Sequence, residues 1–256
     1  MWSTIVDRLK SGEAVYGTMI RFSRDPGIAN IITNAGFDFA LIDMEHSVYS
    51  FETVADIIRV ARGTGIATIV RPPVRSKPYL CRIMDSGATG VMVPMTETRE
   101  HAEEIRDCCK YRSPGKRGIG GSLGHTNYQR LAALEMVETS NLKTLIIAQV
   151  ESQCGIDNID DIVSTDGIDG IIIGPNDLSD SLGVLGQITC TQVTDCIQKV
   201  VDCCKKYGKF SGIHTGNMEQ LHYWRERGMQ LLAYKTDIDV LNEKFAEYLH
   251  AMKVVT

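Results

Sequence analysis

Short runs of aliphatic and β-branched residues alternate with amphipathic stretches along this 256-residue chain. Eight runs have the length of strands, and each is followed by a stretch with helical periodicity. The expected strands are Val15–Met19, Phe37–Asp43, Ala67–Arg71, Gly90–Pro94, Thr144–Val150, Asp169–Ile173, Phe210–Ile213 and Gln230–Ala233. The expected helices are Pro26–Asn34, Phe51–Thr64, Lys77–Ser86, Glu97–Tyr111, Asn158–Ser164, Thr191–Tyr207, Met218–Arg227 and Val240–Met252. The alternation predicts an α/β fold with a parallel sheet, and eight repeats favour a closed (β/α)8 TIM barrel over an open doubly wound sheet.

No linker, repeat or change of composition divides the chain, so one barrel domain over residues 1–256 is expected. Barrels of this kind typically have about 250 residues. A short N-terminal helix over Thr4–Lys10, with Ser3 as its cap, is expected to close the bottom of the barrel. The one long irregular segment runs from Ser113 to Asn127, and loops of this length are usually functional or mobile.

Composition excludes several classes of function. The net charge is −5 and no run of Lys or Arg is present, which disfavours nucleic acid as a partner. No segment approaches the roughly 20 apolar residues of a membrane span, and the N-terminus lacks an apolar signal core, so a cytoplasmic protein is expected. The eight cysteines include no C-x-x-C and are expected to be reduced, buried thiols. Neither a dinucleotide fingerprint nor a phosphate-binding loop occurs, so roles for NAD or ATP have no support.

Polar residues stand where four of the expected strands end. In a parallel barrel these carboxyl ends meet at one mouth, where active sites lie. The residues are Asp43, Glu45 and His46 after the second strand, Arg71 at the third, Glu151 after the fifth and Asp177 after the sixth. Their convergence indicates an enzyme site.

Glu151 and Asp177 offer two hard oxygen ligands to one divalent cation. Such a pair suits Mg²⁺ or Mn²⁺, accepts Co²⁺ or Zn²⁺, and leaves coordination positions for water and substrate. A metal held in this open way is a Lewis acid that can bind a 2-oxo acid and stabilise its enolate. Arg71 is permanently charged and fits the same oxyanion or carboxylate.

His46 is the natural proton carrier of this set, because an imidazole titrates near neutrality. Asp43 or Asp85 is expected to orient it. The segment Gly174-Pro175-Asn176 and the Gly118–Gly124 run offer backbone N–H groups that could hold a substrate carboxylate, although glycine-rich loops often serve only as turns.

The segments IDMEHS, VRPP, VPM, RGIGG, AQVES and GPNDLSDSLG together resemble the HpcH/HpaI family of metal-dependent pyruvate aldolases. That family includes 4-hydroxy-2-oxoheptanedioate and 2-dehydro-3-deoxyglucarate aldolases, and the similarity runs from Tyr16 to Asp237. The resemblance implies a barrel that cleaves 4-hydroxy-2-oxo acids into pyruvate and an aldehyde, or condenses them.

Roles for single residues also follow from the resemblance. It implies Glu151 and Asp177 as metal ligands and Arg71 as the enolate-stabilising arginine. His46 would be the acid/base, partnered by Asp43 and Asp85, while Gln149, Gly174 and Pro175 would line the pyruvate pocket. It further implies a homohexamer, a trimer of dimers with exchanged C-terminal helices and with sites near subunit boundaries.

The chain departs from the family pattern at four positions, Met44, Asn176, His214 and Lys235. These changes leave the metal–enolate half intact. A cation or imidazole near the mouth, as at Lys235 or His214, would favour an acidic aldehyde as the second substrate.

The main hypothesis is therefore a class II, metal-dependent pyruvate aldolase. A second reading uses Lys235 as a Schiff-base nucleophile, with its pKa lowered by burial. A third is a barrel that binds a 2-oxo acid without turning it over. A related lyase that acts on phosphoenolpyruvate or an acyl thioester also stays open.

Overall fold

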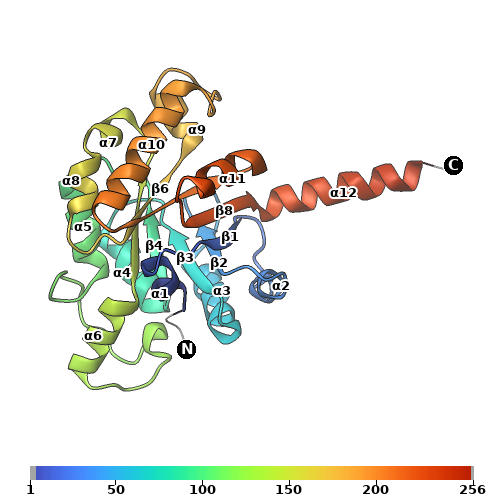
Figure 1. Cartoon of the computed structure of the whole chain (residues 1–256). Coiled ribbons are helices and arrows are strands. Elements are labelled where there is room, and N and C mark those ends of the chain that lie inside the picture. Colours follow the sequence, from blue (N-terminus) through green and yellow to red (C-terminus); the bar gives the residue numbers. More distant parts are fainter. Residues whose placement is uncertain (1–3, 255–256) are drawn as a thin grey trace.

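Eight parallel strands close into a barrel in chain order, β1 to β8, in the computed structural model, which describes residues 4–254 (Figure 1). Each strand pairs with the next, and β8 pairs with β1. The strands are β1 Val15–Ile20, β2 Phe39–Asp43, β3 Ala67–Arg71, β4 Gly90–Val93, β5 Leu145–Val150, β6 Gly170–Ile173, β7 Phe210–Thr215 and β8 Leu231–Thr236. The predicted fold class, an α/β TIM barrel, is confirmed.

Large apolar side chains fill the inside of the barrel. Phe39, Met92 and Phe210 belong to one buried cluster with aliphatic residues of the other strands. Glycines make room for the two rings: a Cβ at Gly170 would overlap the Phe210 ring, and one at Gly17 the Phe39 ring. The interior is therefore a packed core rather than a channel, as is usual for this fold.

Helix α1 (Thr4–Lys10) closes one end of this core. Its apolar residues Ile5, Val6 and Leu9 are buried in the same cluster as the strand side chains. The expected N-terminal helix is thus confirmed, while its proposed cap, Ser3, lies outside the described residues. With that end covered, a ligand can reach the strands from the opposite, carboxyl-terminal end.

The helices around the barrel follow the expected alternation. The predicted set corresponds to α2 Ile28–Asn34, α3 Phe51–Thr64, α4 Lys77–Ser86, α5 Arg99–Cys109, α8 Ile159–Ser164, α10 Thr191–Lys206, α11 Met218–Glu226 and α12 Asp237–Lys253. Four further elements were not expected: η1 Gly124–Thr126, α6 Ala133–Lys143, α7 Gln153–Asp157 and α9 Pro175–Ser181. Three of them are short, and α6 buries only Met136, so none carries a long apolar stripe.

The last strand and helix differ most from the prediction. β8 continues to Thr236, and α12 begins directly after it at Asp237. The start of α12 is fixed by a capping box, in which Thr236 and Asp239 each bond the other's backbone N–H. The strand end and the helix start are therefore one continuous structure at the barrel mouth.

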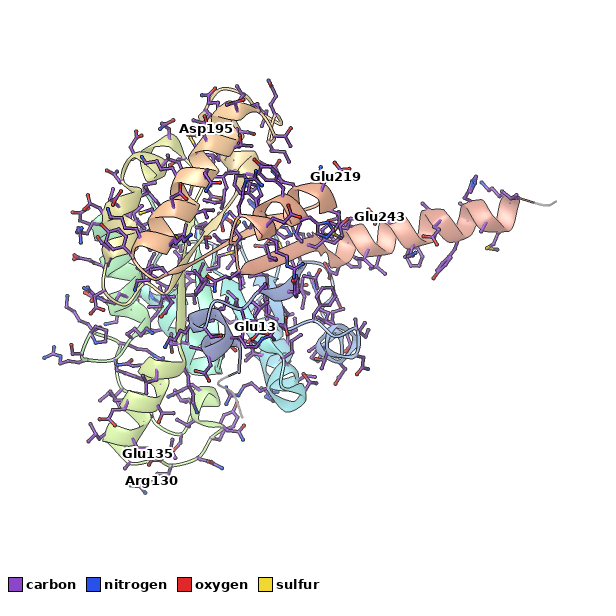
Figure 2. All side chains as sticks on the ribbon, viewed as in Figure 1. Glu13, Arg130, Glu135, Asp195, Glu219 and Glu243 are labelled. Atoms are coloured by element: carbon purple, nitrogen blue, oxygen red, sulfur yellow. The ribbon has the colours of Figure 1, made fainter. Side chains whose placement is uncertain are left out.

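Helix α12 leaves the barrel and extends far from it (Figure 1). Among its residues only Asp237 is buried, and Figure 2 shows side chains around its projecting part with no other element against them. Its exposed apolar residues are Val240, Leu241, Phe245, Tyr248, Leu249 and Met252.

All eight cysteines are free thiols. Burial raises the pKa of Cys108 and Cys203 to about 11 each, which makes these thiols poor nucleophiles. Within residues 4–254, no helix is both long and apolar enough to cross a membrane.

Candidate active site

A cavity of about 390 Å³ opens at the carboxyl-terminal ends of the strands. Most of the residues predicted from the sequence line it: His46, Arg71, Gln149, Gly174, Pro175, Asn176 and Asp177. Much of the remaining wall is formed by Arg21, His214, Thr236 and Asp239. Residues from at least six strand ends therefore share one space.

Asp43 and Arg71 form a buried ion pair at the ends of neighbouring strands. They are register partners in β2 and β3, so pairing of the strands sets them side by side. The Arg71 guanidinium donates from Nε to Asp43 Oδ1 at 2.9 Å and from Nη2 to Oδ2 at 2.8 Å. Burial would raise the pKa of Asp43, but the bonds and charge of Arg71 outweigh it, so this pKa lies below its usual value. The two-bond geometry fixes the plane of the guanidinium.

Asp43 also holds the turn that carries His46, but it does not bond the imidazole. Its Oδ1 accepts from the backbone N–H of Glu45 at 3.0 Å and of His46 at 3.3 Å. The expected Asp43–imidazole contact is thus replaced by a contact to the backbone of the same residue. Asp43 positions the turn as a whole.

Glu45 is the carboxylate that faces the His46 ring. One of its oxygens, Oε2, lies 3.7 Å from His46 Nε2 and 3.1 Å from Arg71 Nη1. Burial raises the pKa of Glu45 although Arg71 opposes it, and Asp177 adds repulsion. The His46 side chain is 58% exposed, so in a single chain it stands at the open edge of the mouth.

Glu151 is more buried than Asp177, the other carboxylate predicted to bind the metal. It follows β5, where its Oε1 accepts from the backbone N–H of Met95 at 2.9 Å and its Oε2 accepts from the side chain of Gln149. Met95 has a left-handed backbone with φ 50°, an unfavourable conformation for a methionine. Burial raises the pKa of Glu151 to about 7. The hydrogen bond from Met95 lowers this pKa, and repulsion from Asp177 raises it further.

The surroundings of Glu151 and Asp177 fit a cation. The two carboxylates repel each other, and the Oε1 atom of Gln149 beside them is buried without a hydrogen-bond partner. A Cβ at Gly174 would lie 2.5 Å from Glu151 Oε2, so only glycine fits beside that oxygen at the start of α9. In residues 4–254 no three His, Cys, Asp or Glu residues cluster as a closed metal site would require. The residues suit an open site completed by water and substrate.

Asp85 lies away from this mouth. It stands in the last turn of α4, and its carboxylate pairs with the buried guanidinium of Arg117. In a βα barrel the C-terminus of a helix lies at the end where the next strand begins, opposite the active-site face. Within one chain Asp85 therefore does not contact His46, and its predicted role as the partner of His46 stays a prediction. The Gly118–Gly124 run also does not line the cavity, since Gly124 packs against the carbonyl of Ser86 at the end of α4.

The positions that depart from the family pattern have different surroundings. Met44 is buried in the core between strands and helices, whereas Asn176 lines the cavity. His214 also lines it, with Nε2 3.1 Å from the carbonyl oxygen of Lys235. Burial lowers the pKa of His214, and Arg71 and Arg21 lower it further, which favours a neutral imidazole.

Lys235 does not have the environment of a Schiff-base nucleophile. Its ammonium group pairs with Glu243 on α12, and this contact raises its pKa. A nucleophilic lysine requires the opposite change, because only the neutral amine attacks a ketone. The structure therefore gives no support to the alternative based on Lys235.

Two features of the site were not found from the sequence: Arg21, and the Met95 backbone N–H that binds Glu151. Glu45 was expected at the mouth, but Asp43 or Asp85 was expected to face the His46 ring in its place. Arg21 directly follows β1, which ends at Ile20, whereas the strand was expected to end at Met19. Met95 belongs to the segment VPM, but the type of a residue does not indicate that its backbone N–H is a donor to the site.

Comparisons with known proteins agree with this geometry. The family model of the HpcH/HpaI aldolase/citrate lyase family matches residues 21–241. A hydroxypyruvate/pyruvate aldolase of Roseobacter denitrificans is 32% identical over 243 residues, which cover 93% of each chain. A 5-keto-4-deoxy-D-glucarate aldolase of Klebsiella pneumoniae is 30% identical over 229 residues, covering 90% of this chain and 89% of the relative.

A solved structure shows the same arrangement. The crystal structure of an HpcH/HpaI aldolase from Desulfitobacterium hafniense superposes with a TM-score of 0.94 at 31% identity. The match covers 98% of this chain and 97% of the other. The similarity therefore includes the strand ends that form the mouth.

Proposed function

The chain belongs to the HpcH/HpaI aldolase/citrate lyase family and is a carbon–carbon lyase of the aldolase type; we propose that it is a class II enzyme, dependent on a divalent metal. Its reaction would be the reversible cleavage of 4-hydroxy-2-oxo acids into pyruvate and an aldehyde. Hydroxypyruvate is a further candidate for the nucleophile, because a relative is a hydroxypyruvate/pyruvate aldolase. The barrel would form a single catalytic domain.

The observation that carries this proposal is that Asp177, Arg71 and His46 line one cavity, with the buried carboxylate of Glu151 directly behind Gly174 in its wall. Two carboxylates at one side repel each other in the absence of a cation. Across the mouth, Asp43 holds the Arg71 guanidinium in a fixed plane. Each of its Nη atoms has a second N–H that is free to donate to a substrate. An anionic 2-oxo acid between them would be held from both sides.

Glu151 and Asp177 are the residues proposed to hold the metal, with Mg²⁺ or Mn²⁺ as first choices and Co²⁺ or Zn²⁺ as alternatives. When bound, the metal would supply Lewis-acid polarisation of the 2-oxo group. Gln149, Gly174, Pro175 and Asn176 would line the pyruvate pocket. The missing side chain at Gly174 leaves space beside Glu151 Oε2 that a Cβ would fill.

The remaining steps are assigned to side chains of this chain. His46 removes the proton from the 4-hydroxyl group, and the bond between C3 and C4 breaks as the aldehyde carbonyl forms. The bonding electrons become the enolate of pyruvate, whose oxygen accepts hydrogen bonds from Arg71. A proton returned to C3 completes pyruvate, and the reverse sequence gives condensation. Glu45 and Asp43 act as positioning residues for His46 and Arg71.

We also propose that the chain works as a homo-oligomer, a hexamer built from dimers that exchange α12. The support is the projecting helix, whose exposed residues include Phe245, Leu249 and Met252. Apolar faces of this extent are normally covered in solution. A cytoplasmic location is proposed with it, because eight free cysteines suit a reducing compartment.

The test is release of pyruvate, followed with lactate dehydrogenase over a panel of 4-hydroxy-2-oxo acids. Activity is expected with added Mg²⁺ or Mn²⁺ and should vanish in EDTA. Glu151→Gln should abolish turnover without unfolding the chain. The matched control is Glu135→Gln on the exposed helix α6, which should behave like the wild type (Figure 2).

Two outcomes would contradict the proposal. Full activity in EDTA would exclude the metal-dependent mechanism. Tight binding of pyruvate or oxalate without turnover of any member of the panel would instead favour a barrel that only binds 2-oxo acids.

A further inference from the structure

A second arginine, Arg21, lines the candidate active site on the side opposite the proposed metal ligands. It follows β1, and in an eight-stranded barrel β1 stands across from β5, which precedes Glu151. Its side chain lines the same cavity as Arg71 and Asp177. A substrate that spans the cavity would meet Arg21 with the end remote from the metal.

The two arginines differ in how many of their donors are engaged. Each of the three nitrogens of Arg71 lies at 2.8–3.1 Å from a carboxylate oxygen of Asp43 or Glu45. For Arg21 the contacts are longer: Nη2 lies 3.2 Å from Asp43 Oδ2 and 3.3 Å from Met19 Sδ. Its Nε is buried without a hydrogen-bond partner. A charged donor left without an acceptor is costly, so an anion at this position would be stabilised.

The backbone that carries Arg21 is held in place. The carboxylate of Asp237, at the start of α12, accepts from the N–H groups of Arg21, Phe22 and Ser23 at 2.8–3.3 Å. The guanidinium therefore extends from a segment that is fixed before substrate arrives. Preorganisation of this kind lowers the entropy lost on binding.

The other basic groups near the mouth are poorer candidates for an anion. The ammonium group of Lys235 is already paired with Glu243. His214 is held by the Lys235 carbonyl and is favoured in its neutral form. A carboxylate that enters the cavity beyond Arg71 thus finds its best partner in Arg21.

We propose that Arg21 is the specificity-determining residue for the aldehyde substrate and binds a carboxylate that this substrate carries. The chain would then prefer acidic aldehydes of the glyoxylate type over neutral aldehydes of the same size. The inference rests on the proposed function, because pyruvate must occupy the end near Glu151 and Asp177 for the aldehyde to reach Arg21. The new carbon–carbon bond forms between the two ends, which leaves the aldehyde substituent on the Arg21 side.

The first experiment measures binding by calorimetry to the full-length protein in Mg²⁺. The ligands are 2-oxoglutarate and 2-oxopentanoate, which have the same chain length and differ in the terminal carboxylate. The wild type is expected to bind the diacid about 10- to 100-fold more tightly, the range for one charged hydrogen-bonded group. Arg21→Met should remove this difference, and Arg21→Lys should keep part of it, because charge remains while the planar fork is lost. Lys235→Met is the matched control and should bind both ligands as the wild type does.

The second experiment compares condensation of pyruvate with glyoxylate and with acetaldehyde. Arg21→Met should lower the ratio of kcat/KM for glyoxylate to kcat/KM for acetaldehyde by about 10- to 100-fold. An unchanged ratio and an unchanged binding difference in this variant would overturn the role of Arg21. Exchange of the pyruvate methyl protons with deuterium, without any aldehyde, separates the two proposals. If the wild type shows no such exchange, the aldolase mechanism itself is refuted. If it shows exchange but no preference for glyoxylate over acetaldehyde, only the inference about Arg21 is refuted.

Discussion

The buried carboxylate of Glu151 should make the metal-free protein less stable as the pH rises. Its pKa in the folded chain is about 7, against 4.5 for a free glutamate. A carboxyl group with a raised pKa stabilises the fold while it is protonated, below pH 4.5, and this contribution is lost as the pH rises through 7. At about 1.4 kcal/mol per pKa unit, ionisation of Glu151 costs about 3 kcal/mol between pH 4.5 and pH 8. For a chain of this size that corresponds to roughly 6–12 °C in Tm.

The assay compares Tm of the wild type and Glu151→Gln at several pH values, in EDTA and at one protein concentration. The variant cannot ionise at this position, so the wild type should lose stability relative to it as the pH rises from 5 to 8. Added Mn²⁺ should restore the wild type most strongly at pH 8, because a ligand that binds only the folded state stabilises it. Parallel Tm curves for the two proteins in EDTA would refute the reasoning, since all other titrating groups are common to both.

Three further predictions concern single residues of the mouth. Asp177→Asn should keep the circular dichroism spectrum and lose Mn²⁺ affinity in a calorimetric titration; wild-type affinity would exclude it as a ligand. His46→Asn should slow pyruvate release by about 10²–10⁴-fold, the usual contribution of a general acid or base, and an unchanged rate would remove His46 from the mechanism. Gly174→Ala places a Cβ 2.5 Å from Glu151 Oε2 and should weaken Mn²⁺ binding at least about tenfold, a loss of about 1.4 kcal/mol. Gly118→Ala, where a Cβ meets nothing within 4 Å, is its control, and equal affinities would contradict the close approach at Gly174.

The strands were predictable because short apolar runs are buried on both faces of a parallel barrel, and the long helices because their buried residues repeat with the helical period. β3 runs over Ala67–Arg71 and α3 over Phe51–Thr64, the ranges expected from the sequence. α6 was missed because it lies on the surface and buries only Met136. α9 was missed because seven residues beginning with a proline resemble a turn as much as a helix.

The site was predictable to the extent that strand register determines it. Asp43 and Arg71 end neighbouring strands, so their contact follows from the fold. Asp85 does not meet His46 of the same chain, because α4 ends at the other end of the barrel, and the sequence alone did not show this direction. Arg21 was missed because its placement depends on Asp237, which is 216 residues away in sequence.

Burial and the charge of Asp177 make ionised Glu151 unfavourable in the metal-free chain, and two hydrogen bonds hold it where it could bind a cation. Its two oxygens are held by Met95, in a left-handed conformation, and by Gln149, so the carboxylate cannot turn away from Asp177. Strain of this kind persists only where the surrounding structure enforces it, and it gathers at functional sites. A carboxylate that could rotate into water would have an ordinary pKa and would lose entropy when it bound a metal. The raised pKa of Glu151 and its proposed role as a ligand are therefore consequences of one fixed geometry.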